Sequence, residues 1–203
     1  MPGADPRAMS HSWLFTGPPG SGRSLAAIDF AAALMCTNPE EPGCGRCEAC
    51  RAVLETKQHT DLVLVDPQEV IIPVDTVREV IGRAASLPTV APWRVVIFNN
   101  ADRLNNNGAN ALLKTVEEPP ARTVIIMCAP SDAPEDFSQT LRSRCRHLYI
   151  PSPSVESITA QLVSEGASDH DAHLAALTSL RHVGRARRLV NDPAVQKRRA
   201  VAI

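Results

Sequence analysis

A glycine-rich run between an apolar segment and a helix-forming segment is the first candidate for chemistry. In G-x-x-x-x-G-K-[ST] loops, glycines let backbone amides surround phosphate, a lysine reaches the β- and γ-phosphates, and a hydroxyl binds Mg²⁺. Here Arg23 replaces that lysine, and its bulkier guanidinium still pairs with phosphate but does not suit phosphoryl transfer. We therefore expect a P-loop whose nucleotide-binding residues are Gly17, Pro18, Pro19, Gly20, Ser21, Gly22, Arg23 and Ser24.

Four cysteines form the second candidate site. They follow the spacing C-x7-C-x2-C-x2-C, with prolines and glycines between them that supply the turns for convergence. Four converging thiolates suit a tetrahedral, structural Zn²⁺ site, which has no open coordination position for catalysis. An iron–sulfur cluster or no metal at all is the alternative, although the C-P sequence that completes the bacterial ferredoxin run is absent. We expect structural zinc on Cys36, Cys44, Cys47 and Cys50.

Composition narrows the classes of partner. The 203 residues include 21 basic and 22 acidic side chains, giving a net charge of −1. This balance argues against coating of nucleic acid or binding to an anionic membrane, and favours protein partners. No run approaches the ~20 apolar residues of a membrane span, and the first residues carry no signal-like apolar region. We expect a cytoplasmic protein with reduced thiols.

Strands and helices alternate along the chain, which predicts an α/β fold with a parallel sheet. A turn-rich stretch, 151–154, marks the boundary to a short helical region. We expect domains 1–150 and 151–203, with the zinc insert 36–50 inside the first. The predicted strands are 13–16, 61–65, 94–98 and 123–128, and the predicted helices are 24–35, 51–57, 76–85 with Asp75 as N-cap, 110–116, 155–164 and 173–180.

Two further motifs carry a family resemblance. The block Asn110-Ala-Leu-Leu-Lys-Thr-Val-Glu-Glu-Pro-Pro120 and the triplet Ser143-Arg144-Cys145, with the P-loop and the cysteine insert, resemble bacterial DNA polymerase III clamp-loader subunits of the AAA+ class. The resemblance covers nearly the whole chain. It implies a P-loop AAA+ sheet flanked by helices, with a zinc insert and a small helical lid region.

The resemblance also implies a function and partners. Family members load a sliding clamp onto primed DNA during replication, as part of a DNA-directed DNA polymerase holoenzyme. Their partners are the gamma/tau and delta subunits, in a hetero-pentamer held by a collar domain. Relative to this family, the chain starts almost at its first strand and ends before the collar, so we expect weak nucleotide affinity and poor assembly from this chain alone.

The family contains ATP-hydrolysing gamma/tau motors and a passive delta-prime stator, and three positions bear on the choice. Asn99 and Asn100 occupy the place of the motor's Asp-Glu pair, and amides supply neither the charge that holds Mg²⁺ nor a base. Ser131 stands at the sensor-1 position. Arg187 stands near the sensor-2 position, with Arg185 and Arg188 as competitors. We expect no intrinsic ATPase, with ATP and Mg²⁺ held weakly if at all.

The triplet Ser143-Arg144-Cys145 is intact, and its arginine acts in trans in this family. An arginine finger on a neighbour's phosphoryl group is worth ~10³–10⁵ in rate. Altered nucleotide residues beside an intact Arg144 favour the delta-prime kind of member.

Other interpretations stay open. Three alternatives remain for the chain: an active gamma/tau-type ATPase, a zinc-dependent DNA-binding module, or an unrelated nucleotide-regulated scaffold. Arg144 has the simpler interpretation of a solvated arginine in a basic run.

Adjacent residues on a helix do not face each other, so we interpret Glu117 and Glu118 as a helix end before two prolines. We interpret the scattered histidines and the C-terminal basic residues as structural or surface groups: His59, His147, His170, His173 and His182, with Arg181, Arg185, Arg187, Arg188, Lys197, Arg198 and Arg199.

Overall fold

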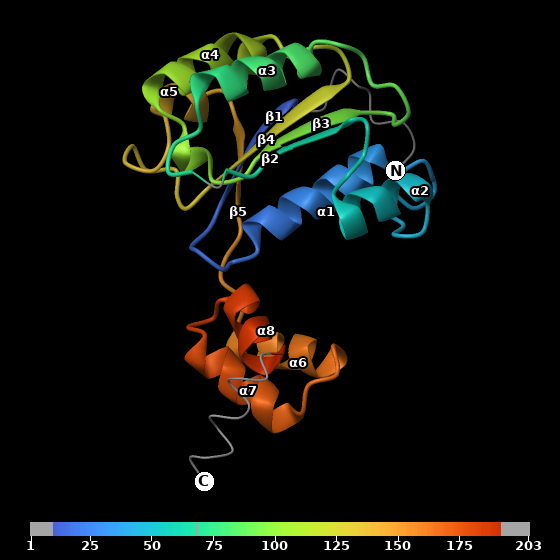
Figure 1. Ribbon diagram of the computed structural model, residues 1–203, viewed down its shortest axis with the longest axis vertical. Helices are drawn as coiled ribbons and strands as arrows, with labels where there is room; N and C mark the ends of the chain where they lie inside the picture. Colours follow the sequence, from blue (N-terminus) through green and yellow to red (C-terminus); the bar gives the residue numbers. More distant parts are fainter. Residues whose placement is uncertain (1–9, 68, 192–203) are drawn as a thin grey trace. The chain divides into compact units, whose positions relative to one another are not determined.

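The computed structural model describes residues 10–67 and 69–191 (Figure 1). The chain divides into two compact units. The first contains the described residues up to Thr16 together with Arg23–Tyr149. The second contains Gly17–Gly22 together with the described residues from Ile150 onward. Lys197, Arg198 and Arg199 lie outside the described residues.

The first unit is built on a parallel sheet, as the alternation of strands and helices predicts. Its five strands run in the order β2-β3-β4-β1-β5, and every pair is parallel. Every residue of β3 and β4 is buried, as is typical of parallel strands covered on both faces. The strands are β1 (Ser12–Thr16), β2 (Leu62–Val65), β3 (Arg94–Phe98), β4 (Thr123–Ala129) and β5 (Arg146–Tyr149).

Helices cover both faces of this sheet (Figure 1). On one face lie α1 (Arg23–Met35) and α2 (Glu48–Arg51), which continues into a π-helical turn, Ala52–Thr56. On the other lie α3 (Val74–Ala84), α4 (Asn106–Glu117) and α5 (Gln139–Arg142).

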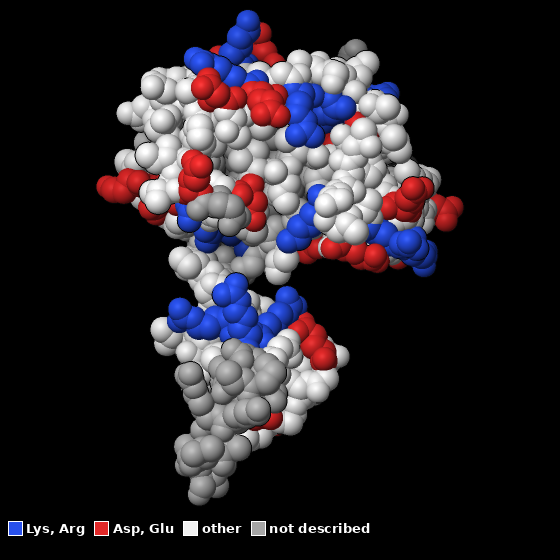
Figure 2. Space-filling view, viewed as in Figure 1, with Lys and Arg blue, Asp and Glu red and all other residues white. Residues whose placement is uncertain are grey.

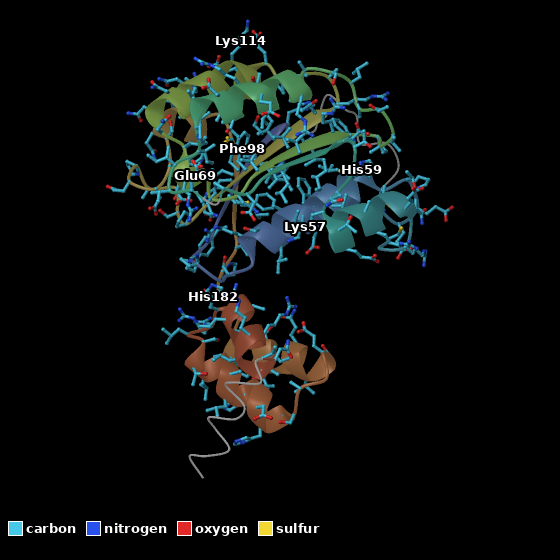
Figure 3. The ribbon with its side chains drawn as sticks, in the orientation of Figure 1. Lys57, His59, Glu69, Phe98, Lys114 and His182 are labelled. Carbon is cyan, nitrogen blue, oxygen red and sulfur yellow. The ribbon has the colours of Figure 1, made fainter. Side chains whose placement is uncertain are left out.

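Alternate residues of each strand point into opposite core layers. Phe98, labelled in Figure 3, packs with Val77 and Leu112 in the layer under α3 and α4. Ile126 and Ile28 belong to the layer under α1.

The predicted starts of α3 and α4 are wrong, each for a local reason. The helix α3 begins at Val74 with Pro73 as its N-cap, so Asp75 lies in the first turn and pairs there with Arg78. Pro fits this position because its fixed φ suits a helix start. The helix α4 begins four residues early because the Asn105 side chain accepts a hydrogen bond from Gly108 N at 2.8 Å.

The second unit contains three helices with a core of their own: α6 (Val155–Ser164), α7 (Asp169–Thr178) and α8 (Val183–Asn191). Ile158, Leu162, Ala175 and Ala186 are buried among them. Ser168 caps α7, which therefore starts earlier than predicted. None of the described helices combines the length and apolar character needed to cross a bilayer.

A buried ion pair joins β2, β3 and the segment that links α3 to β3. The Asp61 carboxylate accepts hydrogen bonds from the backbone N–H groups of Thr89, Val90 and Ala91 at 2.7–2.9 Å. It also accepts one from Arg94 Nη2 at 3.0 Å. Both side chains of the pair are at most 8% exposed. Burial acts to raise the pKa of Asp61, but these four donors outweigh it and hold that pKa well below its usual range.

The other side of the Arg94 guanidinium completes the network. Arg94 Nη1 donates to the carbonyl oxygens of Arg83 and Ser86, at 2.6 and 3.0 Å, and also to Ser86 Oγ. These carbonyls lie at the carboxyl end of α3, where a cation also interacts favourably with the helix dipole. The pair therefore fixes the end of α3 against the start of β3.

We predict that Asp61→Asn destabilises the first unit by about 3–5 kcal/mol, because it leaves Arg94 buried without its counter-charge. Urea unfolding at neutral pH measures the change. The matched control is Asp75→Asn, which breaks an ion pair whose side chains are 86% and 68% exposed, and the free energy of unfolding should not change measurably.

The same pair predicts a pH dependence. Because the folded pKa of Asp61 lies below its unfolded value, its contribution is complete above the unfolded pKa, near ~4. It is lost as pH falls below that value toward the folded pKa. As pH falls from about 5 to about 3, the free energy of unfolding should decrease more in the native protein than in Asp61→Asn. Equal decreases in the two proteins would contradict this account.

Candidate functional site

Arg144 follows α5 and is held by contacts within the first unit. Its Nε donates to Glu117 Oε1 at 2.5 Å. Its Nη1 donates to Thr140 O at 2.9 Å and to Ser143 Oγ at 3.1 Å. The side chain is 36% exposed, so the guanidinium is ordered and still reaches solvent.

A polar network supports the helix that carries this arginine. Arg142 Nε donates to Asp132 Oδ2 at 3.0 Å, and Arg142 Nη2 lies 3.2 Å from His147 Nδ1. The Arg142 bond holds the pKa of Asp132 below its usual range. Because a guanidinium only donates, His147 Nδ1 accepts and its Nε2 donates to Thr16 Oγ1, 2.6 Å away. The network links α5 to the carboxyl end of β1.

Arg23 and Asn100 contact each other in the first unit. Arg23 opens α1 and is 9% exposed. Its Nη2 donates to Asn100 Oδ1 at 3.5 Å. Asn100 adopts a left-handed conformation with φ of 52°, which asparagine tolerates better than most residues. Asn99 follows β3, is 8% exposed and donates its backbone N–H to Val65 O. Asn99 and Asn100 thus lie together directly after β3, and both carry neutral amides.

The glycine loop 17–22 belongs to the second unit and depends on its glycines. Gly20 and Gly22 have φ of +87° and +91°, a region that side chains with Cβ rarely adopt. A Cβ on Gly20 would lie 2.4 Å from His182 Cγ, and one on Gly17 would lie 2.2 Å from Ile150 O. Figure 3 labels His182 in the turn before α8. Gly17 and Gly20 are thus closely packed by backbone and side-chain atoms of their own unit.

Other loop residues differ in exposure. Pro19 is exposed, Pro18 is half-buried, and Ser24 is half-buried in the first turn of α1. Ser21 is buried, and its Oγ has no hydrogen-bond partner among the described residues.

The two sensor candidates are engaged within their own units. Ser131 Oγ donates to Asp136 Oδ2 at 2.7 Å and accepts from Ala133 N at 3.1 Å. Arg187 Nε lies 2.9 and 3.1 Å from the two Glu165 carboxylate oxygens, and its Nη2 lies 2.5 Å from Oε1. This carboxylate raises the pKa of Arg187. The competing candidates, Arg185 and Arg188, are exposed.

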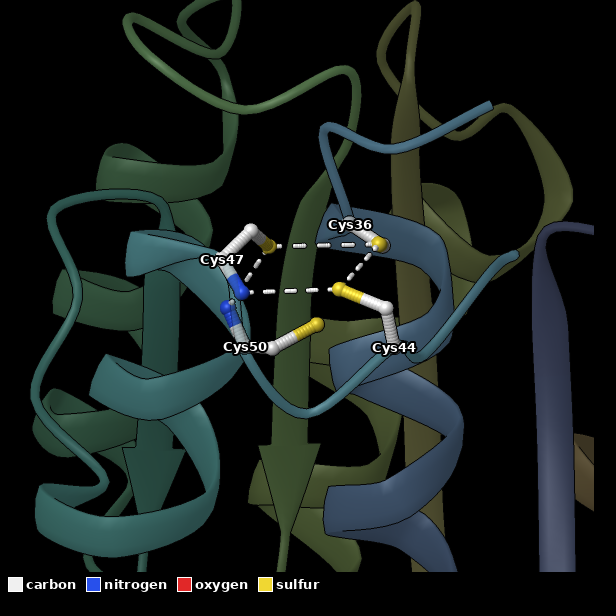
Figure 4. A group of neighbouring side chains, drawn as sticks. All are labelled: Cys36, Cys44, Cys47 and Cys50. Atoms are coloured by element: carbon white, nitrogen blue, oxygen red, sulfur yellow. Dashed lines mark hydrogen bonds between the residues drawn. The ribbon is translucent and has the colours of Figure 1, made fainter. Parts of the chain in front are cut away.

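The cysteines predicted to hold zinc converge after α1 (Figure 4). Their four sulfurs lie within 4.8 Å of one another, and Cys36 Sγ lies 3.7 Å from Cys44 Sγ and 3.9 Å from Cys47 Sγ. Tetrahedral zinc with Zn–S bonds of ~2.3 Å requires sulfurs separated by roughly 3.8 Å. The donor set and its spacing therefore fit a four-thiolate Zn²⁺ site.

The pKa values of two of these thiols are shifted in opposite directions. Cys47 caps α2, and the N–H of Cys50 bonds to its sulfur at 3.4 Å, which lowers the pKa of Cys47 to about 6. Burial raises the pKa of Cys50 to about 12. Cys50 is fully buried and would ionise on binding a metal, because only thiolates are ligands.

The structure also identifies residues that sequence reasoning missed. Glu117 contacts Arg144 and does more than end a helix before prolines. His147, interpreted from sequence as structural or surface, joins Thr16 to Arg142. The signal for His147 was its position two residues after the Ser-Arg-Cys triplet. The pairing of Glu117 with Arg144 had no such signal, because the two residues lie 27 positions apart.

Comparisons with solved structures show the fold. A DNA polymerase III gamma subunit-related protein of Thermotoga maritima superposes with a TM-score of 0.56 and 19% identity, over 90% of this chain and 55% of its own. The RuvB Holliday junction branch migration motor of the same organism gives 0.56 and 17%, over 91% and 54%. These likenesses confirm the predicted AAA+ type of sheet and flanking helices.

Sequence comparisons show the family. Curated relatives named DNA polymerase III subunit delta' are 35% identical in Pseudomonas aeruginosa, over 78% of this chain and 49% of theirs, and 34% identical in Escherichia coli, over 82% and 50%. The tau subunit of Bacillus subtilis is 29% identical, over 77% and 27%.

The chain spans about half the length of the delta-prime relatives it matches. Residues 4–154 match the family described as DNA polymerase III, delta subunit. That match covers most of the sequence motifs described above. The chain belongs to the clamp-loader subunits of this DNA polymerase III family.

Proposed function

We propose that the chain is the delta-prime stator part of a clamp loader, which does not hydrolyse ATP and lends Arg144 to the ATP site of a neighbouring subunit. The observation that carries this proposal is a contrast within the first unit. Asn100 meets Arg23 where a motor needs an acid and a lysine, while the Arg144 guanidinium is ordered and partly exposed.

The first half of the proposal, that this chain does not hydrolyse ATP at its own site, rests on charge. Phosphoryl transfer needs Mg²⁺ between the β- and γ-phosphates, and the metal needs a carboxylate near the end of the strand. Asn99 and Asn100 offer amide oxygens only, and Asn100 Oδ1 already accepts from Arg23. If MgATP binds at this side of the first unit, Arg23 would contact its phosphates, and no base stands at the Asn99–Asn100 position to orient water.

The second half of the proposal, that Arg144 acts on a neighbouring subunit, rests on which of its N–H donors already make hydrogen bonds. Nε and Nη1 make hydrogen bonds within the chain, and Nη2 makes none among the described residues. A charged N–H donor that reaches solvent can bind a phosphate oxygen of another subunit at little reorganisation cost.

Family membership supports the partners we propose: the gamma/tau and delta subunits in a hetero-pentamer, and through it the sliding clamp and primed DNA. The match to a tau subunit makes an active gamma/tau-type ATPase the second candidate, against which the two asparagines stand. A zinc-dependent DNA-binding module fits less well. Basic and acidic side chains are interspersed on the face of the first unit in Figure 2, and net charge is −1.

We also propose that the four cysteines hold a structural Zn²⁺. The insert that carries them packs on α1, and Cys50 Sγ lies 3.6 Å from Ala32 O. A closed four-thiolate site stabilises the local fold and leaves no coordination position for substrate.

The zinc proposal predicts about one zinc per chain by mass spectrometry of metals. Cys47→Ser should lose this zinc and lower the melting temperature by roughly 10 °C, equivalent to about 3 kcal/mol. Arg46→Ala changes an exposed residue of the same insert and should keep both. Iron in place of zinc, or full zinc content in Cys47→Ser, would contradict the proposal.

The own-site proposal predicts that the isolated, zinc-loaded subunit shows no Mg²⁺-dependent ATP hydrolysis above that of Arg23→Ala. Single-turnover assays with labelled ATP measure this directly. Turnover that Arg23→Ala abolishes would establish an active site in this chain and would favour the gamma/tau-type alternative.

The trans proposal predicts that Arg144→Ala slows hydrolysis at the adjacent site of the reconstituted complex by about 10³-fold, with ATP affinity nearly unchanged. Arg144→Lys should rescue little, since an ammonium lacks the planar fork. Single-turnover ATP hydrolysis without clamp or DNA is the measurement. Arg78→Ala, which removes another ion-paired exposed arginine, is the control expected to match the native rate.

A further inference from the structure

We propose that Glu117 is a positioning residue for Arg144, one that holds the guanidinium ready for the phosphate of a neighbouring subunit. This inference rests on the proposed function. It starts from the contact between Glu117 Oε1 and Arg144 Nε at 2.5 Å, which joins the end of α4 to the residue after α5.

The position of Glu117 is fixed by the end of its helix. Glu117 is the last residue of α4. The C-cap residue, Glu118, donates its backbone N–H to Lys114 O at 2.9 Å. Pro119 and Pro120 follow, and proline cannot continue a helix. The carboxylate therefore projects from a defined place.

A shared core fixes α4 relative to α5. Leu112 and Val116 of α4 and Leu141 of α5 are each at most 5% exposed and lie in one hydrophobic cluster. Close-packed interiors transmit position accurately because they deform little. Glu117 and Arg144 are consequently held at a fixed separation by buried residues, and their own exposed contact adds orientation.

The contact uses one edge of the guanidinium and leaves another available. An arginine has five N–H donors. Glu117 takes the Nε donor, while Thr140 O and Ser143 Oγ take the donors of Nη1. Nη2 is the nitrogen without a hydrogen bond among the described residues, so it is the donor that remains for a phosphate oxygen.

A second ion pair of the chain shows an arginine that a carboxylate engages through two of its nitrogens. Arg187 contacts both carboxylate oxygens of Glu165 through Nε and one of them through Nη2. The carboxylate therefore occupies the edge of Arg187 that Nε and Nη2 form. Arg144 instead meets Glu117 through Nε alone. This difference favours positioning over sequestration, because Glu117 orders a flexible side chain and does not occupy Nη2.

The test uses the reconstituted complex, with Glu117→Ala and Glu117→Gln made in the native chain and in Arg144→Ala. Glu117→Ala should lower kcat at the neighbouring site about tenfold with KM for ATP unchanged, since misplacement of a catalytic group affects the transition state. Glu117→Gln retains an acceptor for Nε and should recover part of the rate. In Arg144→Ala, neither change should slow hydrolysis further.

Glu118→Ala is the matched control, because Glu118 is the adjacent exposed glutamate and no hydrogen bond or ion pair of its side chain occurs in the described structure. Its kcat should equal that of the native chain. Unfolding curves confirm that each variant folds.

Three results would overturn the inference, and they are distinguishable. If Arg144→Ala has no effect, the proposed function fails and this inference fails with it. If Arg144→Ala slows hydrolysis but Glu117→Ala does not, only the positioning role fails. If Glu117→Ala raises kcat, Glu117 restrains Arg144 and does not prepare it.

Discussion

All strands of the first unit run in the same direction, and the placement of every polar site residue in that unit depends on this constraint. Parallel strands bring their carboxyl ends to one edge of a sheet, where α/β proteins bind ligands. Here β3 ends at Asn99 and Asn100, and β4 ends shortly before Ser131. The buried Asp61–Arg94 pair secures the opposite end of β3, so the sheet is a rigid base for the side chains at this edge.

Four arginines show how the surroundings of one side-chain type decide its role. Arg94 is buried and both of its terminal nitrogens are hydrogen-bonded, so it is structural. Arg23 meets a neutral amide where a motor has an acid, and Arg187 is closed by a bidentate carboxylate. Arg144 is 36% exposed, and its Nη2 has no hydrogen bond in the described structure, so this donor can reach a partner. The proposed division of labour follows from these contacts.

Sequence reasoning succeeded where the signal was local. The run 94–98 is continuously apolar after Arg94 and was predicted to the residue, and the cysteine spacing predicted a cluster that the structure confirms. It failed for α5 and β5, which have four residues each, because neither is long enough to show a period. Glu117 and Arg144 pair across 27 residues through the packing of α4 on α5, which no local pattern encodes.

The most direct test of the central claim is a structure of the assembled complex, with ADP and aluminium fluoride as a transition-state mimic in the neighbouring ATP site. We predict that Arg144 Nη2 lies within hydrogen-bond distance, about 3 Å, of a fluoride that stands for a γ-phosphate oxygen. Glu117 should still contact Nε in that state. An Arg144 side chain directed to solvent, or an arginine of another subunit at that fluoride, would contradict the account.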